Sequence, residues 1–578
     1  MQSYDVVVVG GGLAGSQVAR MVAQAGRSVA LLSKVHPLRS HSVAAQGGIA
    51  ASLQNVDSQD DWLSHAYDTI KGSDYLADHD AVEILTKLAP AVIRDLEHLG
   101  VLFSRLGDGR IAQRAFGGHS YRRVCFAADK TGHAILHELF LSLWRLGVHI
   151  YDEWYVTQVI YEEGEVKGVV ALRLETGELE VFAAKAIVMA TGGYGRVFNT
   201  TSNDFSSTGD GLGLTWTCGL PLQDMEFVQF HPTGLYPAGV LISEAVRGEG
   251  AYLINDLGER FMANYPISAQ AMELAPRDIT SRCIAYEIAA GRGIGGGPYV
   301  HLDLRHLGAE LICERLPFAR EEGLRLAGVD CITHPLPVRP TVHYSMGGIS
   351  TNTNGQVLDR FLTPVGGYFA VGECACVSVH GANRLGANSL LECVVFGKWV
   401  GEKVADYVQK RSFPSFSPDR YLSSVTAQLE SILQTKGKTR IVELRKELQE
   451  TTTHHCGIFR TENNLKAGLE KIRQIKARYQ QDLHLDDRGK VFNLELQQAL
   501  ELGNLIKVAE AILSSALYRR ESRGAHFRED FPDRDDVNFL HHSVVFAEGE
   551  AVGITQRPVN LSLQQIDPDR FAIKPRIY

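Results

Sequence analysis

The sequence has few cysteines, no long apolar run and no block of basic charge. Nine cysteines among 578 residues are sparse and odd in number, which argues against a complete disulfide framework and favours a reduced, intracellular protein. No run of about 18 apolar residues is present, so the chain is not expected to cross a bilayer by itself. The net charge of −9 is spread along the chain and does not indicate nucleic acid as a partner.

Signals for a secretory leader and for a metal site are also missing. The first strand is expected from about residue 4, with no basic segment and apolar core before it. Cys374 and Cys376 have no second pair at metal-site spacing, and an iron–sulfur cluster needs about four thiolates. The remaining composition, 45% hydrophobic and 22% charged, is that of a globular protein with several domains.

The N-terminus has the pattern of a dinucleotide-binding βαβ unit. A buried strand is expected at residues 4–9, and a second strand at residues 28–32 ends at Ser33 and Lys34. An NAD-binding unit usually has an acidic ribose ligand at that point, so its absence argues against NAD. Between the strands, glycines would let the backbone approach a pyrophosphate at a helix N-terminus. The loop consists of Gly10, Gly11, Gly12, Leu13, Ala14 and Gly15.

A histidine follows this unit within the segment 39–49. His41 and the pair Gly47 and Gly48 suit a flavin ring that lies further along the same crevice. FAD is therefore the expected cofactor. The other candidate contacts in the segment are Ser42, Ala45 and Gln46.

Two later segments repeat the design of a buried strand that ends in glycine. They are residues 186–193 and 367–373, and Glu373 at the end of the second could accept a hydrogen bond from a ribose hydroxyl. Asp210 lies between glycines, and it could be either a cofactor ligand or an ordinary turn residue. A helix is expected over residues 388–409, with Asn388 and Ser389 at its capped start.

These patterns predict an α/β protein built on a Rossmann-type FAD-binding domain. That domain would be discontinuous and comprise residues 1–230 and 343–417, and the inserted block 231–342 would form an α+β capping domain over the flavin. Charged helical periodicity predicts a helical bundle at 418–520, followed by a small C-terminal module at 521–578.

Five loops around the expected crevice combine glycine or proline with arginine or histidine. Any one of them could be merely structural, but their recurrence beside one crevice favours a site for a small dianion. An arginine can pair with one carboxylate through two hydrogen bonds while histidines hold the other. The candidates are His231, Ser243, Glu244, Arg247, Arg277, His343 and Arg384.

The ordered motifs resemble those of the succinate dehydrogenase and fumarate reductase flavoprotein family. They include Arg-Ser-His-Ser at 39–42, His-Pro-Thr-Gly at 231–234, Arg-Gly-Glu-Gly at 247–250 and Pro-Arg-Asp at 276–278. The resemblance continues through 343–348, 381–390 and 456–460 to 521–530, and so covers nearly the whole chain.

The resemblance implies a function and a set of residue roles. Succinate would be oxidised to fumarate by hydride transfer to FAD bonded covalently to His41, with Ser389 and Leu390 among the cofactor contacts. The dicarboxylate would be held by His231, Ser243, His343 and Arg384. Ser243 stands where many members have threonine, which keeps the hydroxyl and loses a methyl group.

Proton transfer has two interpretations. The resemblance implies that Arg277 exchanges a proton with the substrate and that Glu244 and Arg247 relay it towards solvent. A guanidinium is effectively always protonated, so Arg277 could instead stabilise developing charge while a water transfers the proton.

The resemblance also implies partners. The chain lacks cysteines for a cluster and a span to reach a quinone, so an iron–sulfur subunit and membrane anchor subunits would complete the electron path. The chain would then lie peripherally at the cytoplasmic face of a bacterial membrane.

Three alternatives stay open at this point. Gln46 is typical of succinate-oxidising members, whereas some fumarate reductases have glutamate there, yet either direction is chemically possible. L-aspartate oxidase resembles this chain in the sequence of residues 244–253 and 388–393, but it lacks a flavin-linking histidine at the position that His41 occupies here. A flavin-binding scaffold without catalysis would require the arginine and histidine cluster to be incidental.

Overall fold

A twisted, mostly parallel sheet forms the centre of the molecule, here described from a computed structural model that covers residues 1–549 and 551–576. Val8 of β1 lies beside Leu31 of β2 and Val188 of β9, all in parallel register. These apolar residues are buried because helices or loops cover both faces of the sheet. In spatial order the strands are β17 (Gln356–Leu358), β18 (Pro364–Ala370), β8 (Glu165–Arg173), β9 (Leu179–Met189), β1 (Gln2–Val9), β2 (Val29–Ser33) and β6 (His149–Asp152), and β7 (Trp154–Glu162) pairs with β8.

Two helices cover one face of this sheet. α1 (Leu13–Gln24) and α10 (Asn388–Gln409) approach closely, since a Cβ atom on Gly397 would meet Gln17 Cβ at 2.8 Å. The bounds of α10 confirm the helix predicted at 388–409. The predicted cap was wrong: Ala387 occupies the N-cap position, and the Asn388 amide donates to Thr69 instead.

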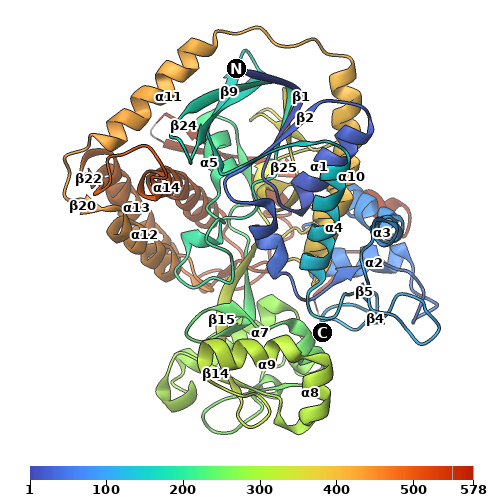
Figure 1. Cartoon of the computed structure of the whole chain (residues 1–578). Helices are drawn as coiled ribbons and strands as arrows, with labels where there is room; N and C mark the ends of the chain where they lie inside the picture. The colour runs from blue at the N-terminus through green and yellow to red at the C-terminus, as the bar shows by residue number, and fades with distance from the viewer. Residues whose placement is uncertain (550, 577–578) are drawn as a thin grey trace.

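The block 231–342 forms the lower lobe in Figure 1, and two long strands connect it to the main body. These strands, β11 (Val228–Leu235) and β15 (Leu336–Ser345), pair antiparallel. The lobe has an apolar core of its own, drawn from residues 235–338. Its remaining elements are β12 (Val240–Leu241), α6 (Glu244–Gly248), β13 (Tyr252–Ile254), α7 (Arg277–Ala289), β14 (Val300–Asp303), α8 (Ala309–Arg315) and α9 (Pro317–Glu322).

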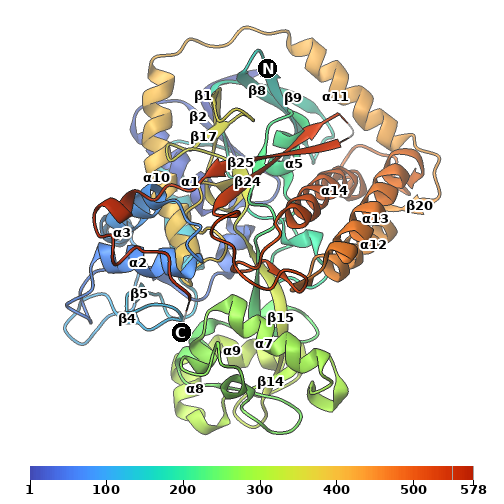
Figure 2. The same cartoon turned by 180° about the vertical axis from the view of Figure 1, so that it is seen from behind.

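A helical region lies beside the sheet (Figure 2). Its longest helix packs against α5 (Asp210–Thr217), where a Cβ atom on Gly213 would meet Asn504 Oδ1 at 2.4 Å. The region consists of α11 (Pro418–Leu433), α12 (Ile441–His455), α13 (Glu462–Gln481) and α14 (Leu494–Tyr518).

The last segment, from residue 521, is joined to the main body. β24 (His541–Glu548) pairs with β10 (Leu222–Gln223) and with β25 (Ala551–Pro558) in a second sheet. Leu563 and Phe571 belong to the same apolar cluster as the residues between β1, α1 and α10. The segment therefore shares the core of the main body. No helix in the described part of the chain is long and apolar enough to cross a membrane.

Candidate active site

A cavity of about 430 Å³ begins at the carboxyl ends of β1, β2 and β9 and continues to the junction with the lower lobe. It brings together nearly every residue predicted from the sequence. Gly15 and Arg247 are the exceptions among the predicted residues, because both lie behind the cavity wall. The predicted residues that line it are Gly10, Gly11, Gly12, Leu13, Ala14, Ser33, Lys34, His41, Ser42, Ala45, Gln46, Gly47, Gly48, Asp210, His231, Ser243, Glu244, Arg277, His343, Glu373, Arg384, Ser389 and Leu390.

The glycine loop forms one end of the cavity. Gly10 has a φ of 115°, and a Cβ atom there would meet the Ala190 carbonyl oxygen at 2.2 Å. At Gly15 a Cβ atom would meet the Gly10 carbonyl oxygen at 2.0 Å, so this glycine allows α1 to pack on its own loop. Gly12 is the N-cap of α1 and offers no side-chain acceptor. The loop and helix start thus fit the pyrophosphate of a dinucleotide such as FAD.

Lys34 occupies the position where an NAD-binding unit has an acid. Its Nζ atom donates to Asp210 at 2.7 Å and to Glu501 at 2.8 Å. Burial lowers the pKa of Lys34, but the two carboxylates outweigh that effect and raise it. Sequence reasoning missed Glu501, which lies on α14, because only the tertiary fold brings this helix to Lys34.

His41 lies in a short 3₁₀ helix, His41–Ala44, at the middle of the cavity. The backbone N–H of Asp204 donates to its Nδ1 atom at 3.2 Å, and Asn203 Nδ2 is 3.3 Å from its Nε2 atom. Burial lowers the pKa of His41, so the ring is neutral at neutral pH. Both contacts come from a loop that the sequence did not single out.

Two arginines converge on one amide at the other end. Gln229 Oε1 accepts from Arg277 Nη1 at 3.0 Å and from Arg384 Nη2 at 3.1 Å. Burial and the charge of Arg277 lower the pKa of Arg384 to about 9. Gln229 was missed, although it precedes His231 by only two positions on β11.

Glu244 is fixed by three neighbours. Arg277 Nε donates to its Oε2 atom at 2.8 Å, the Gly117 N–H donates to Oε1 at 2.9 Å, and Arg247 Nη2 lies 3.6 Å from Oε2. Burial raises the pKa of Glu244, but the two guanidinium groups outweigh burial and lower it. A Cβ atom on Gly117 would meet Glu244 Oε1 at 2.4 Å, so this glycine, also missed, makes room for the carboxylate.

The two histidines face each other at an edge-to-face angle, with ring centroids 5.1 Å apart. His343 Nδ1 is 2.9 Å from Ser202 Oγ, and the Thr233 N–H donates to His231 Nδ1 at 3.3 Å. Burial, with the nearby charge of Arg277, lowers the pKa of both histidines well below the usual range. Both rings are therefore neutral at neutral pH.

Several buried polar atoms at this end lack a hydrogen-bond partner within the described residues. They are His231 Nε2, Arg247 Nε and Nη2, and Arg384 Nε. Three guanidinium groups are also buried here: those of Arg247 and Arg277 pair with the one carboxylate of Glu244, and that of Arg384 pairs with no carboxylate among the described residues, which leaves two positive charges in excess. Unpaired buried charge is costly, so the arrangement fits a ligand with two negative charges.

Ser243 and Glu373 have specific local roles as well. Ser243 is the N-cap of α6, where its Oγ atom accepts from the Ala245 N–H at 3.3 Å, and its hydroxyl hydrogen stays available. Glu373 Oε1 accepts from the Ser345 N–H at 3.0 Å, and burial raises the pKa of Glu373 to about 7.

The chain matches two protein-family models. Residues 5–390 match an FAD-binding domain, and residues 445–578 match the C-terminal domain of fumarate reductase flavoproteins. The glycine loop, His41 and the predicted residues that line the cavity all lie within the first match.

Known relatives match the chain over nearly its whole length and belong to the same family. The chain is 44% identical to the succinate dehydrogenase flavoprotein subunit of Rickettsia bellii, over 100% of this chain and 98% of the relative. It is 44% identical to the fumarate reductase flavoprotein subunit of Mycobacterium tuberculosis, over 95% of each chain. A quinol fumarate reductase variant of E. coli superimposes with a TM-score of 0.92 at 38% identity over 97% of each chain. The chain therefore belongs to the family of succinate dehydrogenase and fumarate reductase flavoprotein subunits.

Proposed function

We propose that this chain oxidises succinate to fumarate at the cavity between the sheet and the lower lobe. The observation on which the proposal rests is the excess of two positive charges, with unpartnered donors, at one end of a cavity whose other end is a dinucleotide loop. When bound, FAD supplies the acceptor for hydride from the substrate. The block 231–342 acts as the capping domain that encloses the reaction.

Each residue near the dianion has one proposed task. Arg384 pairs with one carboxylate, and His231, Ser243 and His343 bind the substrate from the neighbouring strands and helix. Arg277 takes the proton from the substrate as its own Nε–H proton moves to Glu244, because its guanidinium is fixed between Glu244 and Gln229 and lines the cavity. Glu244 and Arg247 then pass the proton away from the cavity.

His41 is the proposed point of covalent attachment for FAD. A neutral imidazole is the nucleophilic form, and burial maintains it at neutral pH. Nδ1 accepts a hydrogen bond from the Asp204 N–H, and Nε2, which lies 3.3 Å from Asn203 Nδ2, is the nitrogen that would give up its hydrogen and bond to the cofactor. Ser42, Ala45, Gln46, Gly47, Gly48, Asp210, Glu373, Ser389 and Leu390 are the remaining proposed cofactor contacts in the cavity lining.

Electrons from this site need an acceptor outside the chain. No group of three or more metal-binding side chains suited to a metal ion occurs among the residues that the structure describes. We propose an iron–sulfur subunit as the acceptor, with membrane anchor subunits and a quinone beyond it, and a peripheral location at the cytoplasmic face of the membrane.

Dye-coupled turnover and malonate binding test the proposal. The FAD-loaded chain should reduce an artificial dye with succinate, and its flavin should stay with the protein after acid precipitation. Arg384→Ala should weaken malonate binding by about 1.5–3 kcal/mol, roughly 10- to 150-fold, because a charge-assisted contact is lost. Aspartate oxidation faster than succinate oxidation, together with acid-released flavin, would instead support an L-aspartate oxidase, and dye-coupled fumarate reduction faster than succinate oxidation would support a reductase.

A further inference from the structure

The chain's last segment crosses from the main body to the lower lobe. After β25 it runs over α2 (Trp62–Gly72) and α3 (His79–Leu99), as the red tail in Figure 2 shows. Leu563 and Phe571 are buried, the Leu563 N–H donates to His79 Nδ1 at 3.1 Å, and the Phe571 ring packs on the His79 ring. Packing against these helices therefore fixes the course of the tail.

Arg576, near the end of this tail, contacts one carboxylate from each side of the boundary. Its Nη2 atom donates to Asp278 Oδ2, and its Nε atom lies 3.5 Å from Asp74 Oδ2. Asp278 is in the first turn of α7 in the lower lobe, whereas Asp74 follows α2 in the main body. The side chain of Arg576 is only 7% exposed and that of Asp278 only 1%, so water screens this pair weakly.

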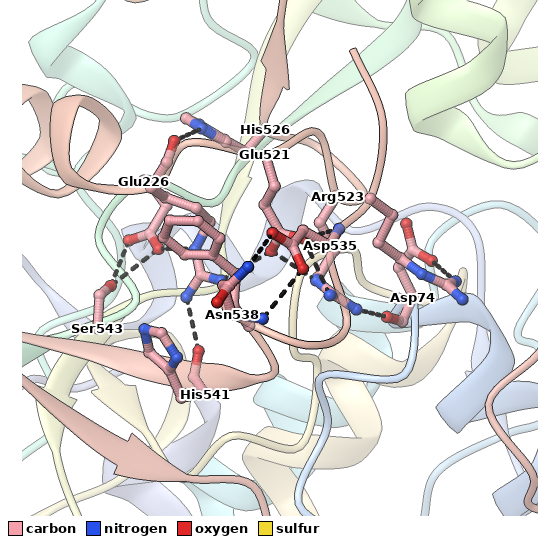
Figure 3. Close-up of polar contacts among 12 residues, drawn as sticks. Asp74, Glu226, Glu521, Arg523, His526, Asp535, Asn538, His541 and Ser543 are labelled. Carbon is pink, nitrogen blue, oxygen red and sulfur yellow. Dashed lines mark hydrogen bonds and ion pairs between the residues drawn. The ribbon is translucent and has the colours of Figure 1, made fainter. Parts of the chain in front are cut away.

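Asp74 is a rigid attachment point. Its Oδ1 atom pairs with Arg534 at 2.8 Å, and its Oδ2 atom accepts from the Gly524 N–H at 2.8 Å. Burial raises the pKa of Asp74, but Arg576, Arg523 and Arg534 outweigh burial and lower it to about 2. Figure 3 shows Asp74 beside the buried charged pairs around Arg523 and Glu521. A fixed, ionised carboxylate thus holds the guanidinium from the main-body side.

The other partner, Asp278, is the sequence neighbour of Arg277. Both lie in the first turn of α7, so a movement of that turn also moves the guanidinium of Arg277 away from Gln229. Arg384 belongs to the main body and shares the cavity with Arg277, and the lining at this end is buried, since His231 is 0% exposed and Arg384 is 2% exposed. Separation of the two parts would therefore widen access to this end.

We infer that Arg576 is an interdomain clamp that holds the first turn of α7 against the main body and so positions Arg277. Breaking the clamp should shift the lower lobe towards open conformations. Its kinetic consequence rests on the proposed function of Arg277, whereas its conformational consequence does not.

Contacts elsewhere on α7 limit the expected effect. Arg282 lies 4.9 Å over the Phe527 ring and 3.5 Å from Asp278, and the rings of Tyr286 and Phe459 are 4.7 Å apart. These contacts remain when Arg576 is replaced. The lobe should therefore sample open conformations more often without detaching.

A distance between two spin labels tests the conformational step in the FAD-loaded chain. Cys313 is exposed on α8 of the lower lobe, and Leu102→Cys, at an 84% exposed position, provides a label on the main body. In Arg576→Met the distance distribution should gain a population at longer distance, and malonate should remove that population. In Arg576→Lys the added population should be smaller. Arg292→Met is the matched control, because it breaks an ion pair with Glu287 inside the lower lobe.

Steady-state kinetics gives an independent measurement. In Arg576→Met the KM for succinate and the Kd for malonate should rise about tenfold, because only the closed fraction binds tightly. The kcat should change much less, since bound substrate restores closure. An unchanged distance distribution in Arg576→Met, or an equal change in Arg292→Met, would overturn the clamp. A changed distribution in Arg576→Met together with an active Arg277→Ala enzyme would support the clamp and reject only the role of Arg277.

Discussion

Two buried clusters of arginine differ in how completely their charges are paired. In the cluster at the start of the C-terminal segment, Arg519 pairs with Glu226 at 2.5 Å and with Glu521 at 2.9 Å, and Arg523 pairs with Glu521 at 2.8 Å. Figure 3 shows Glu226 with Ser543, whose Oγ atom donates to it, and Glu521 beside Arg523. At the substrate end of the cavity, Arg247 and Arg277 share the single carboxylate of Glu244, and Arg384 pairs with no carboxylate among the described residues.

The difference separates a structural cluster from a binding site. Arg519 and Arg523 have no orphaned nitrogen among the described residues, whereas Arg384 Nε and two nitrogens of Arg247 lack hydrogen-bond partners there. A buried charge without a partner costs free energy, and a ligand can supply the missing partner. A surplus of unpaired donors therefore indicates a ligand site better than the number of arginines does.

The largest expected effect comes from removing an arginine at the substrate end of the cavity, and it is on turnover. Arg277→Ala should lower kcat about 10³-fold or more, because it removes the proposed proton-transfer residue, while malonate still binds. Stopped-flow reduction of the bound flavin by succinate measures this step directly. Arg292→Met, which breaks a pair elsewhere in the same lobe, should retain turnover. Substantial turnover in Arg277→Ala would favour proton transfer by water.

In the fully paired cluster the expected loss is in stability. Arg519→Met should lower the free energy of unfolding by about 3–5 kcal/mol, because it leaves Glu226 and Glu521 buried without their shared cation. Urea unfolding followed by circular dichroism measures this loss. The exposed pair of Arg173 and Glu175 is the control, and Arg173→Met should cost about 0–1 kcal/mol. Equal losses in the two variants would contradict the assignment of the cluster as structural.

The pH dependence of the same network is a smaller effect. The folded pKa of Asp74, about 2, is below the usual value, so its contribution to stability is full above pH about 4 and is lost as pH falls towards 2. The lowered pKa of Asp74 contributes about 2 kcal/mol to the free energy of unfolding near neutral pH. Asp74→Asn should thus be less stable than the wild type at pH 6, and the gap should narrow by pH 3. Urea midpoints at both pH values measure the difference in stability between the two proteins. A difference that does not change with pH would contradict the lowered pKa of Asp74.

The smallest expected effect is at Ser243. Ser243→Thr keeps the N-cap acceptor of α6 and the hydroxyl that faces the cavity. Because the added methyl group changes only local packing, the KM for succinate should stay within about threefold. Ser243→Ala, which removes the hydroxyl, should raise it further. Similar KM values for the threonine and alanine variants would exclude a substrate contact through this hydroxyl.

The sequence predicted the elements whose causes are local. The strand, glycine loop and helix at residues 2–24 form as expected, because a buried strand followed by closely spaced glycines allows few other conformations. The bounds of α10 follow from its apolar periodicity. The family resemblance, from motifs along the whole chain, and the fold class are confirmed by the relatives and by the superimposed structure.

Only the tertiary structure decided which distant residues meet. Lys34 pairs with Glu501, Gln229 joins Arg277 to Arg384, and Arg576 reaches Asp278 across the boundary of the lower lobe. Neither spacing nor periodicity encodes such pairs, because the partners lie up to 467 positions apart and their approach depends on how separate helices and strands pack. The sequence thus determined the local elements and the types of residue at the site, and packing determined which charges were paired and which were left for a ligand.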